Sequence, residues 1–159
     1  KERYHTLEIS RLSGMLKQMP KLGWILGFCA MASLGLPGLA GFWGEFPAIL
    51  SAYSPAAGLS EGTFRVYMVI AALGTVFAAA YLLWLYQRTA FGEPNPEFDS
   101  HGHGHGHDDH HSDIHDVNTF EWIAWTPLLI AIVVFGVVPN LMFKIIDPAV
   151  ASIVTHIGG

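Results

Sequence analysis

A single carboxylate stands alone in a long apolar stretch of this sequence. Glu45 is the only charged residue between Leu22 and Tyr53. An ionisable side chain at the centre of a membrane span costs about 2.5–3.5 kcal/mol on insertion scales, so such groups are usually buried against protein or water and functional. The position predicts that Glu45 handles a proton or an ion. The alternative is an ordinary acid whose carboxylate reaches the membrane surface.

A second candidate for chemistry is the histidine-rich segment at 101–111. Imidazole and carboxylate groups suit zinc, nickel or copper. The histidines alternate with glycine in a simple repeat, whereas structural metal sites fix their ligands rigidly. We expect a solvated loop that binds metal only adventitiously, and a functional metal site is the alternative. The candidate ligands are His101, His103, His105, His107, His110 and His111.

The tripeptide Leu36-Pro37-Gly38 interrupts the apolar stretch shortly before Glu45. Proline lacks an N–H and clashes with the carbonyl four residues earlier, and glycine adopts backbone angles that other residues avoid. The apolar stretch is also longer than the roughly 20 helical residues that cross a bilayer core. The sequence therefore predicts two half-helices joined by a short loop, which is how transporters build ion sites.

Small residues and a second proline surround the acid. Gly38, Gly41 and Gly44 recur at every third position and allow a neighbouring helix to approach closely. Pro47 removes a backbone donor within a turn of the acid, which leaves a carbonyl acceptor free. The acid therefore has a plausible polar niche inside an apolar helix.

The composition is that of a membrane protein. Hydrophobic residues make up 52% of the chain and charged residues only 13%, which argues against a soluble domain and against a nucleic-acid partner. The lone cysteine, Cys29, excludes an internal disulfide. The chain has no initiator methionine and opens with polar residues, so we expect a piece of a longer protein.

Apolar runs and polar interruptions predict an all-α membrane protein with three transmembrane spans. Thr119 is the expected N-cap of the last span. The predicted segments are a cytoplasmic or interfacial segment at 1–21, a discontinuous transmembrane helix at 22–53, an external loop at 54–65, a transmembrane helix at 66–88, a His-rich cytoplasmic linker at 89–118, a transmembrane helix at 119–138 and an interfacial tail at 139–159.

Positive charges predict the orientation of these spans. Three crossings place 1–21 and 88–118 on one side of the membrane, and 54–65 and the C-terminus on the other. The first side holds Lys1, Arg3, Arg11, Lys17, Lys21 and Arg88, and the second holds only Arg65 and Lys144. By the positive-inside rule the His-rich loop is cytoplasmic and the C-terminus lies on the opposite side.

Three motifs resemble one protein family. Residues 32–46, ASLGLPGLAGFWGEF, closely resemble the signature of the M subunit (chain 4) of proton-pumping NADH:quinone oxidoreductase, respiratory complex I. Residues 2–6, ERYHT, are similar to the basic stretch that precedes it, and residues 88–92, RTAFG, to the motif that ends the next helix. The His-rich linker looks like an insertion, and Pro47 departs from the family pattern, which has an aliphatic residue there.

The resemblance implies a role in proton translocation. It implies that the chain corresponds to the last three helices of an antiporter-like subunit, including a discontinuous one. It places Glu45 at the family's acidic position near the outlet of the proton path. Related antiporter-like subunits usually carry lysine there, so the glutamate favours the M type. The family's central lysine and its earlier glutamate–lysine pair belong to helices outside this chain.

The resemblance also implies the setting. The NADH and quinone sites lie in other subunits, so this chain is expected to hold no cofactor, although it is part of an enzyme, a proton-translocating oxidoreductase. The expected partners are the other membrane-arm subunits, including neighbouring antiporter-like subunits, and the lipid bilayer. The expected location is the bacterial inner membrane. The alternatives are a subunit of a related cation/proton antiporter or membrane-bound hydrogenase, and a metal transporter that uses the His-rich loop.

Deleting residues 101–111 tests the histidine segment. A solvated loop makes no contribution to a fixed site, so the deletion in the intact complex is expected to leave NADH oxidation and proton pumping unchanged. Loss of a metal-dependent activity in the deletion variant would instead assign the histidines a functional metal site.

Overall fold

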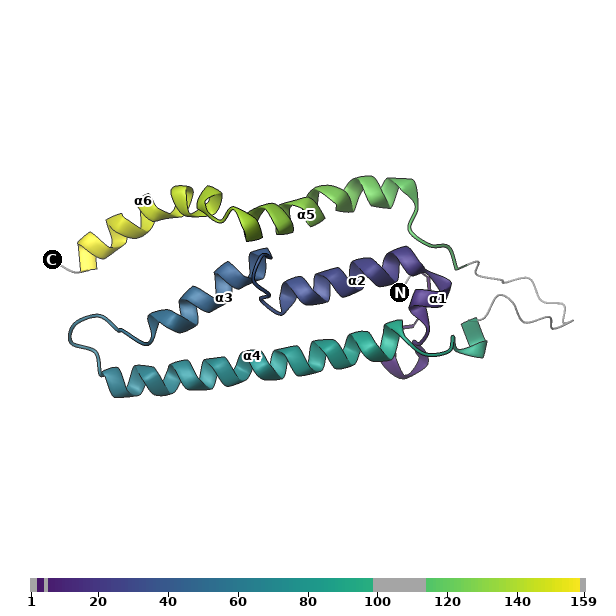
Figure 1. The fold of residues 1–159 in the computed structure, drawn as a ribbon, viewed down its shortest axis with the longest axis horizontal. Coiled ribbons are helices and arrows are strands. Elements are labelled where there is room, and N and C mark those ends of the chain that lie inside the picture. Colours follow the sequence, from purple (N-terminus) through teal and green to yellow (C-terminus); the bar gives the residue numbers. More distant parts are fainter. Residues whose placement is uncertain (1–2, 5, 99–113, 158–159) are drawn as a thin grey trace, which may run out of the picture. The chain divides into compact units, whose positions relative to one another are not determined.

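The fold is entirely helical over the described residues. The computed structural model describes residues 3–4, 6–98 and 114–157, so the candidate ligands at 101–111 lie outside the described residues. No strand occurs in the described ranges, which confirms the all-α class. Along the chain (Figure 1) the elements are η1 (Ile9–Arg11), α1 (Met15–Gln18), α2 (Pro20–Ser33), α3 (Ala40–Ser51), α4 (Glu61–Ala90), η2 (Pro96–Phe98), α5 (Thr119–Val137) and α6 (Asn140–Ile157).

The predicted helix break is present. Helix α2 ends at Ser33 and α3 begins at Ala40, and the ribbon leaves the helical path between them (Figure 1). Gly35 and Gly38 in this connection have φ angles of 65° and 93°. These left-handed angles strain residues with a side chain, so the break needs glycine at both positions.

Two helices in the described part of the chain, α4 and α5, are long and apolar enough to cross a membrane. Helix α4 has 30 residues and begins at Glu61, inside the predicted external loop at 54–65. The hydroxyl of Ser60 accepts a hydrogen bond from the backbone N–H of Thr63 at 3.5 Å, and Arg65 pairs with Glu61 one turn later at 2.9 Å. These local contacts extend the helix by a turn beyond the apolar sequence.

The start of α5 is capped by a residue other than the predicted one. Thr119 is the first helical residue, and its backbone N–H donates to Oδ1 of the preceding Asn118 at 2.6 Å. The backbone N–H of Asn118 donates to Oε2 of Glu121 at 2.8 Å, which is the reciprocal half of a capping box. The Thr119 prediction was wrong because asparagine, one residue earlier, is an equally good cap and has glutamate at the third helical position.

The described chain forms two compact units. One consists of Lys1–Met31 and Val76–Ala124, and the other of Ala32–Thr75 and Trp125–Gly159. The first unit contains the buried side chains of Tyr4, Met19, Ala90 and Val117. The second contains the helix break and Glu45.

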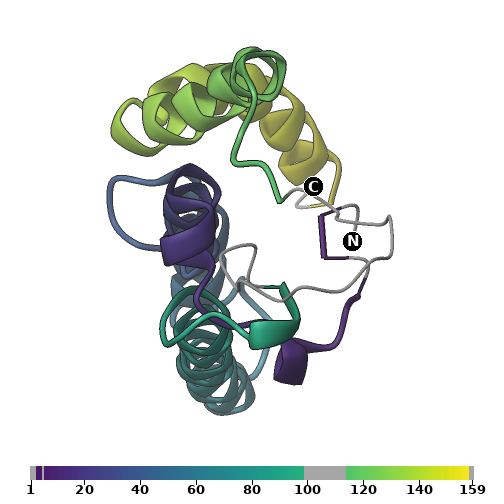
Figure 2. The same cartoon turned by 90° about the vertical axis from the view of Figure 1, so that its right-hand side faces the viewer.

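In the first unit the N-terminal segment is tied to the chain that follows α4. The guanidinium of Arg11 pairs with Glu97, and Nζ of Lys17 lies 2.5 Å from Oε1 of Glu93. The backbone N–H of Gly14 donates to the carbonyl of Phe91 at 3.1 Å. Figure 2 shows the result, with the purple η1 beside the teal η2. Sequence reasoning had treated these two segments as separate interfacial and linker regions.

A distant carboxylate caps the half-helix α2. The side chain of Asp116 accepts hydrogen bonds from the backbone N–H groups of Lys21 at 3.1 Å and Leu22 at 3.2 Å, and from Val117 at 2.8 Å. Partial burial raises the pKa of Asp116, but the three N–H donors and the charge of Lys21 outweigh it and lower the pKa overall. A negative charge at a helix N-terminus also interacts favourably with the helix dipole.

Replacing Asp116 tests this cap. Asp116→Ala is expected to speed amide hydrogen exchange at the start of α2 about fivefold, because losing an N-terminal cap costs roughly 1 kcal/mol. Exchange of a peptide covering Lys21 and Leu22 in the intact protein measures it. Asp147→Ala, an acid in α6 with no capping role among the described residues, is the control. Equal exchange in both variants would contradict the cap.

The cap also has a pH dependence with a defined sign. Because the folded pKa of Asp116 is lowered from 3.8, its stabilisation is fully present above that value and is lost as the pH falls through the lowered pKa. Protection of α2 is therefore expected to be constant at neutral pH.

Candidate functional site

Glu45 lies on α3 immediately after the helix break. Its side chain points back toward the break, and Oε2 lies 3.0 Å from the position that a Cβ on Gly35 would occupy. The carboxylate therefore rests against backbone that no side chain covers. Among the described residues Glu45 has no ion pair and no hydrogen bond, and it is exposed in this chain.

Aromatic residues flank Glu45 in the sequence of its own helix. The rings of Phe42 and Phe46 stack with centroids 4.9 Å apart, and Phe42 meets Trp43 edge to face at 5.2 Å. Such rings provide no counter-charge, so any polar partner of Glu45 must come from water or from protein beyond the described residues.

Trp43 links α3 to the end of α5. Its indole Nε1 donates a hydrogen bond to the carbonyl of Gly136 at 2.8 Å. Gly136 lies in the last turn of α5, where carbonyl groups have no partner further along the helix. The ring also meets Phe143 of α6 edge to face at 6.0 Å. The indole thus satisfies a helix-terminal acceptor and fixes the α3 backbone two residues before Glu45.

The end of α5 contacts the helix break backbone to backbone. A Cβ added to Gly136 would lie 2.2 Å from the carbonyl oxygen of Gly38 and 2.4 Å from Cα of Leu39. No rearrangement of a side chain can relieve such contacts, so glycine is required there. Sequence reasoning missed Gly136, for which the only signal was a single glycine within an otherwise apolar helix.

The predicted close-packing residues behave differently from one another. Gly41 is approached by the carbonyl of Ala32, which would lie 2.3 Å from an added Cβ. Gly44 has no atom within 4 Å of that position in the described part of the chain. Pro47 lies inside α3 and does not end it. The break residues Leu36 and Pro37 lie in the connection between α2 and α3, as predicted.

The described residues contain no cluster of three His, Cys, Asp or Glu side chains that would hold a metal ion. The histidine segment lies outside the described residues, so the structure does not bear on its prediction.

Comparison with known proteins identifies a family for the segment that contains this site. Residues 1–70, which include the break and Glu45, match the family described as NADH:quinone oxidoreductase/Mrp antiporter, TM. The chain is 34% identical over 158 residues to NADH-quinone oxidoreductase subunit M of Rhodobacter capsulatus, an alignment that covers 98% of this chain and 26% of that protein.

Other similar proteins carry the same or an equivalent subunit name. Subunit M of Rickettsia conorii is 31% identical over 155 residues, covering 96% of this chain and 27% of the relative. NADH-ubiquinone oxidoreductase chain 4 of Arabidopsis thaliana is 28% identical over 158 residues, with 98% and 27% covered. The chain thus spans about a quarter of the length of the curated relatives it matches. The chain belongs to the NADH:quinone oxidoreductase/Mrp antiporter membrane family, and within it to the subunit M (chain 4) branch.

Proposed function

We propose that this chain forms the last part of a proton-translocating membrane subunit of NADH:quinone oxidoreductase, and that Glu45 accepts and releases the proton. The observation that carries the proposal is the position of Glu45, a carboxylate without a counter-charge among the described residues, set against the bare backbone of a broken helix. Quinone reduction in other subunits would drive the transfer. In this proposal the chain holds no cofactor of its own.

The proposed topology has three spans. Helices α2 and α3 have 14 and 12 residues, which at 1.5 Å per residue gives about 21 and 18 Å. Neither alone crosses a hydrocarbon core of roughly 30 Å, so the two together form one crossing. Helices α4 and α5 form the other two, and α6 forms an interfacial tail. The segments at 1–21 and 88–118 then face the cytoplasm.

The broken helix gives the carboxylate its chemistry. Backbone groups freed by a break in a membrane helix must be satisfied by protein or by a water-filled cavity, and the proposal places water beside Glu45. A change in hydration or in the charge of a basic group elsewhere in the subunit would therefore switch Glu45 between loading and releasing a proton.

Glu45→Gln tests the proposal directly. The amide keeps the size of the side chain and removes its titration, so the number of protons pumped per electron is expected to fall by at least half. Proton uptake and NADH oxidation are measured together in membranes that contain the intact complex. Glu61→Gln, which changes the acid that begins α4 and pairs with Arg65, is the matched control.

Two outcomes decide the matter. Glu45→Asp, which restores a carboxyl group, is expected to recover part of the pumping. Full pumping coupled to NADH oxidation in Glu45→Gln would refute the role of Glu45.

A second prediction concerns Trp43 as a positioning residue. Trp43→Phe keeps an aromatic ring beside Phe143 and removes the N–H that binds the carbonyl of Gly136. A hydrogen bond of about 1 kcal/mol corresponds to roughly a fivefold effect. The variant is expected to lower coupled pumping by about that factor and to shift its pH profile, because the segment that holds Glu45 moves.

The control is Phe143→Leu, which removes the ring contact and keeps the hydrogen bond. An unshifted pH profile in Trp43→Phe, or an equal shift in Phe143→Leu, would show that the bond does not position Glu45.

The matching family also includes Mrp antiporters, so a cation/proton antiporter subunit is the second candidate. Sodium dependence of transport separates the two, since a pump driven by quinone reduction works in sodium-free medium.

A further inference from the structure

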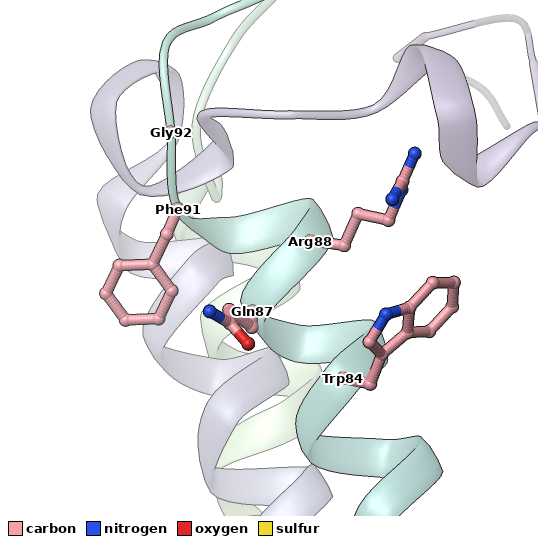
Figure 3. A pocket seen from close by; sticks show the side chains of 5 residues that line it. All are labelled: Trp84, Gln87, Arg88, Phe91 and Gly92. Carbon is pink, nitrogen blue, oxygen red and sulfur yellow. The ribbon is translucent and has the colours of Figure 1, made fainter.

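A pocket lies at the C-terminal end of α4, within the first unit of the chain. Its volume is about 390 Å³, and it is lined by Trp84, Gln87, Arg88, Phe91 and Gly92. Figure 3 shows Trp84 and Arg88 on one side of the helix end, Phe91 on the other, and Gln87 between them. This volume falls within the usual range of small-molecule sites, about 300–1,000 Å³. None of the five residues contributes to the site around Glu45.

The guanidinium of Arg88 has no carboxylate partner among residues 3–4, 6–98 and 114–157. Its Cζ lies 5.5 Å from the ring centroid of Trp84, and it forms no ion pair or hydrogen bond within the described residues. The other described arginines and Lys17 each pair with a glutamate. These pairs are Arg3–Glu121, Arg11–Glu97, Lys17–Glu93 and Arg65–Glu61. The donors of Arg88 are thus available to a ligand.

Arg65 shows what Arg88 lacks. Its Cζ lies over the ring of Tyr53 at 5.1 Å, in the same kind of contact as Arg88 makes with Trp84. However, its Nη2 also binds Oε2 of Glu61 at 2.9 Å. The two arginines therefore share an aromatic neighbour and differ in having an internal counter-ion.

The position along α4 sets the depth of Arg88 in the proposed membrane topology. No charged residue lies between Arg65 and Arg88. At 1.5 Å per residue this part of the helix is about 35 Å long, slightly more than the roughly 30 Å hydrocarbon core. Each arginine then reaches one headgroup layer, and tryptophan is typical of that layer. By the positive-inside rule Arg88 lies in the cytoplasmic leaflet.

We propose that this pocket binds the phosphate headgroup of an anionic phospholipid from the cytoplasmic leaflet. A guanidinium binds two phosphate oxygens at once through parallel N–H donors. The Gln87 amide supplies a further donor for a glycerol or ester oxygen, and the rings of Trp84 and Phe91 contact the apolar part of the lipid. A zwitterionic choline headgroup is disfavoured, because its cation would lie beside the arginine.

The test uses photo-crosslinking in the intact complex. The purified complex is reconstituted into vesicles of phosphatidylcholine that contain a photoactivatable phosphatidylglycerol, and the crosslinked peptide is identified by mass spectrometry. Crosslinks are expected within residues 84–92. Arg88→Gln is expected to reduce their yield at least fivefold, and Arg88→Lys, which keeps the charge, is expected to retain part of it.

Arg65→Gln is the matched control. It removes an arginine that lies over an aromatic ring but is already paired with a carboxylate. Its crosslinking yield at residues 84–92 is expected to be unchanged. A photoactivatable phosphatidylcholine is expected to label these residues weakly, and excess inorganic phosphate is expected not to displace the lipid.

Three results would overturn the proposal: no crosslink within residues 84–92, equal yields in Arg88→Gln and the unmodified complex, or displacement by inorganic phosphate, which would assign the pocket to a free anion. The proposal depends on the membrane topology given above and not on Glu45. Crosslinking is read without pumping, so its failure and failure of the Glu45→Gln test are separate results.

Discussion

The contact between Gly136 and the helix break is the constraint on which the second unit depends. A break between two helices interrupts their backbone hydrogen bonding and exposes backbone to its neighbours. Here α5 reaches the break with backbone on backbone at Gly38, and Trp43 in turn binds the carbonyl that the end of α5 leaves free. The end of α5 and the break are therefore closely packed, and this contact would not persist with a side chain at position 136.

That constraint explains why the acid is where it is. The indole bond fixes α3 within its first turn, and Glu45 follows two residues later, with its carboxylate turned toward Gly35. A residue with a side chain at position 35 would fill that space. Glycine at position 136 thus lets α5 approach the break, and glycine at position 35 leaves backbone exposed beside the carboxylate.

The parts of the structure that depend on local backbone chemistry were predictable from the sequence. Pro37 and Gly38 act through their own backbone, so the break and the all-α class follow from the sequence. The contact at Gly136, the Asp116 cap on α2 and the pairing of Arg3 with Glu121 join residues about a hundred positions apart. No periodicity or spacing encodes such contacts. The start of α4 at Glu61 was predictable in principle, because Ser60 and Glu61 are local helix-start signals. The prediction of the span used only the apolar residues and therefore placed its start later.

The pairing of charges in the first unit changes how the positive-inside rule applies to this chain. The rule counts Arg3, Arg11 and Lys17 as full positive charges facing the cytoplasm, yet each binds a glutamate from a segment far along the chain. These pairs hold the N-terminal segment against the chain after α4 and at the start of α5, so their charges act within the protein. Arg88 has no such partner in the described residues. The positive-inside rule thus counts all four of these basic residues, whereas only Arg88 among them keeps a charge without an internal counter-ion in the described part of the chain.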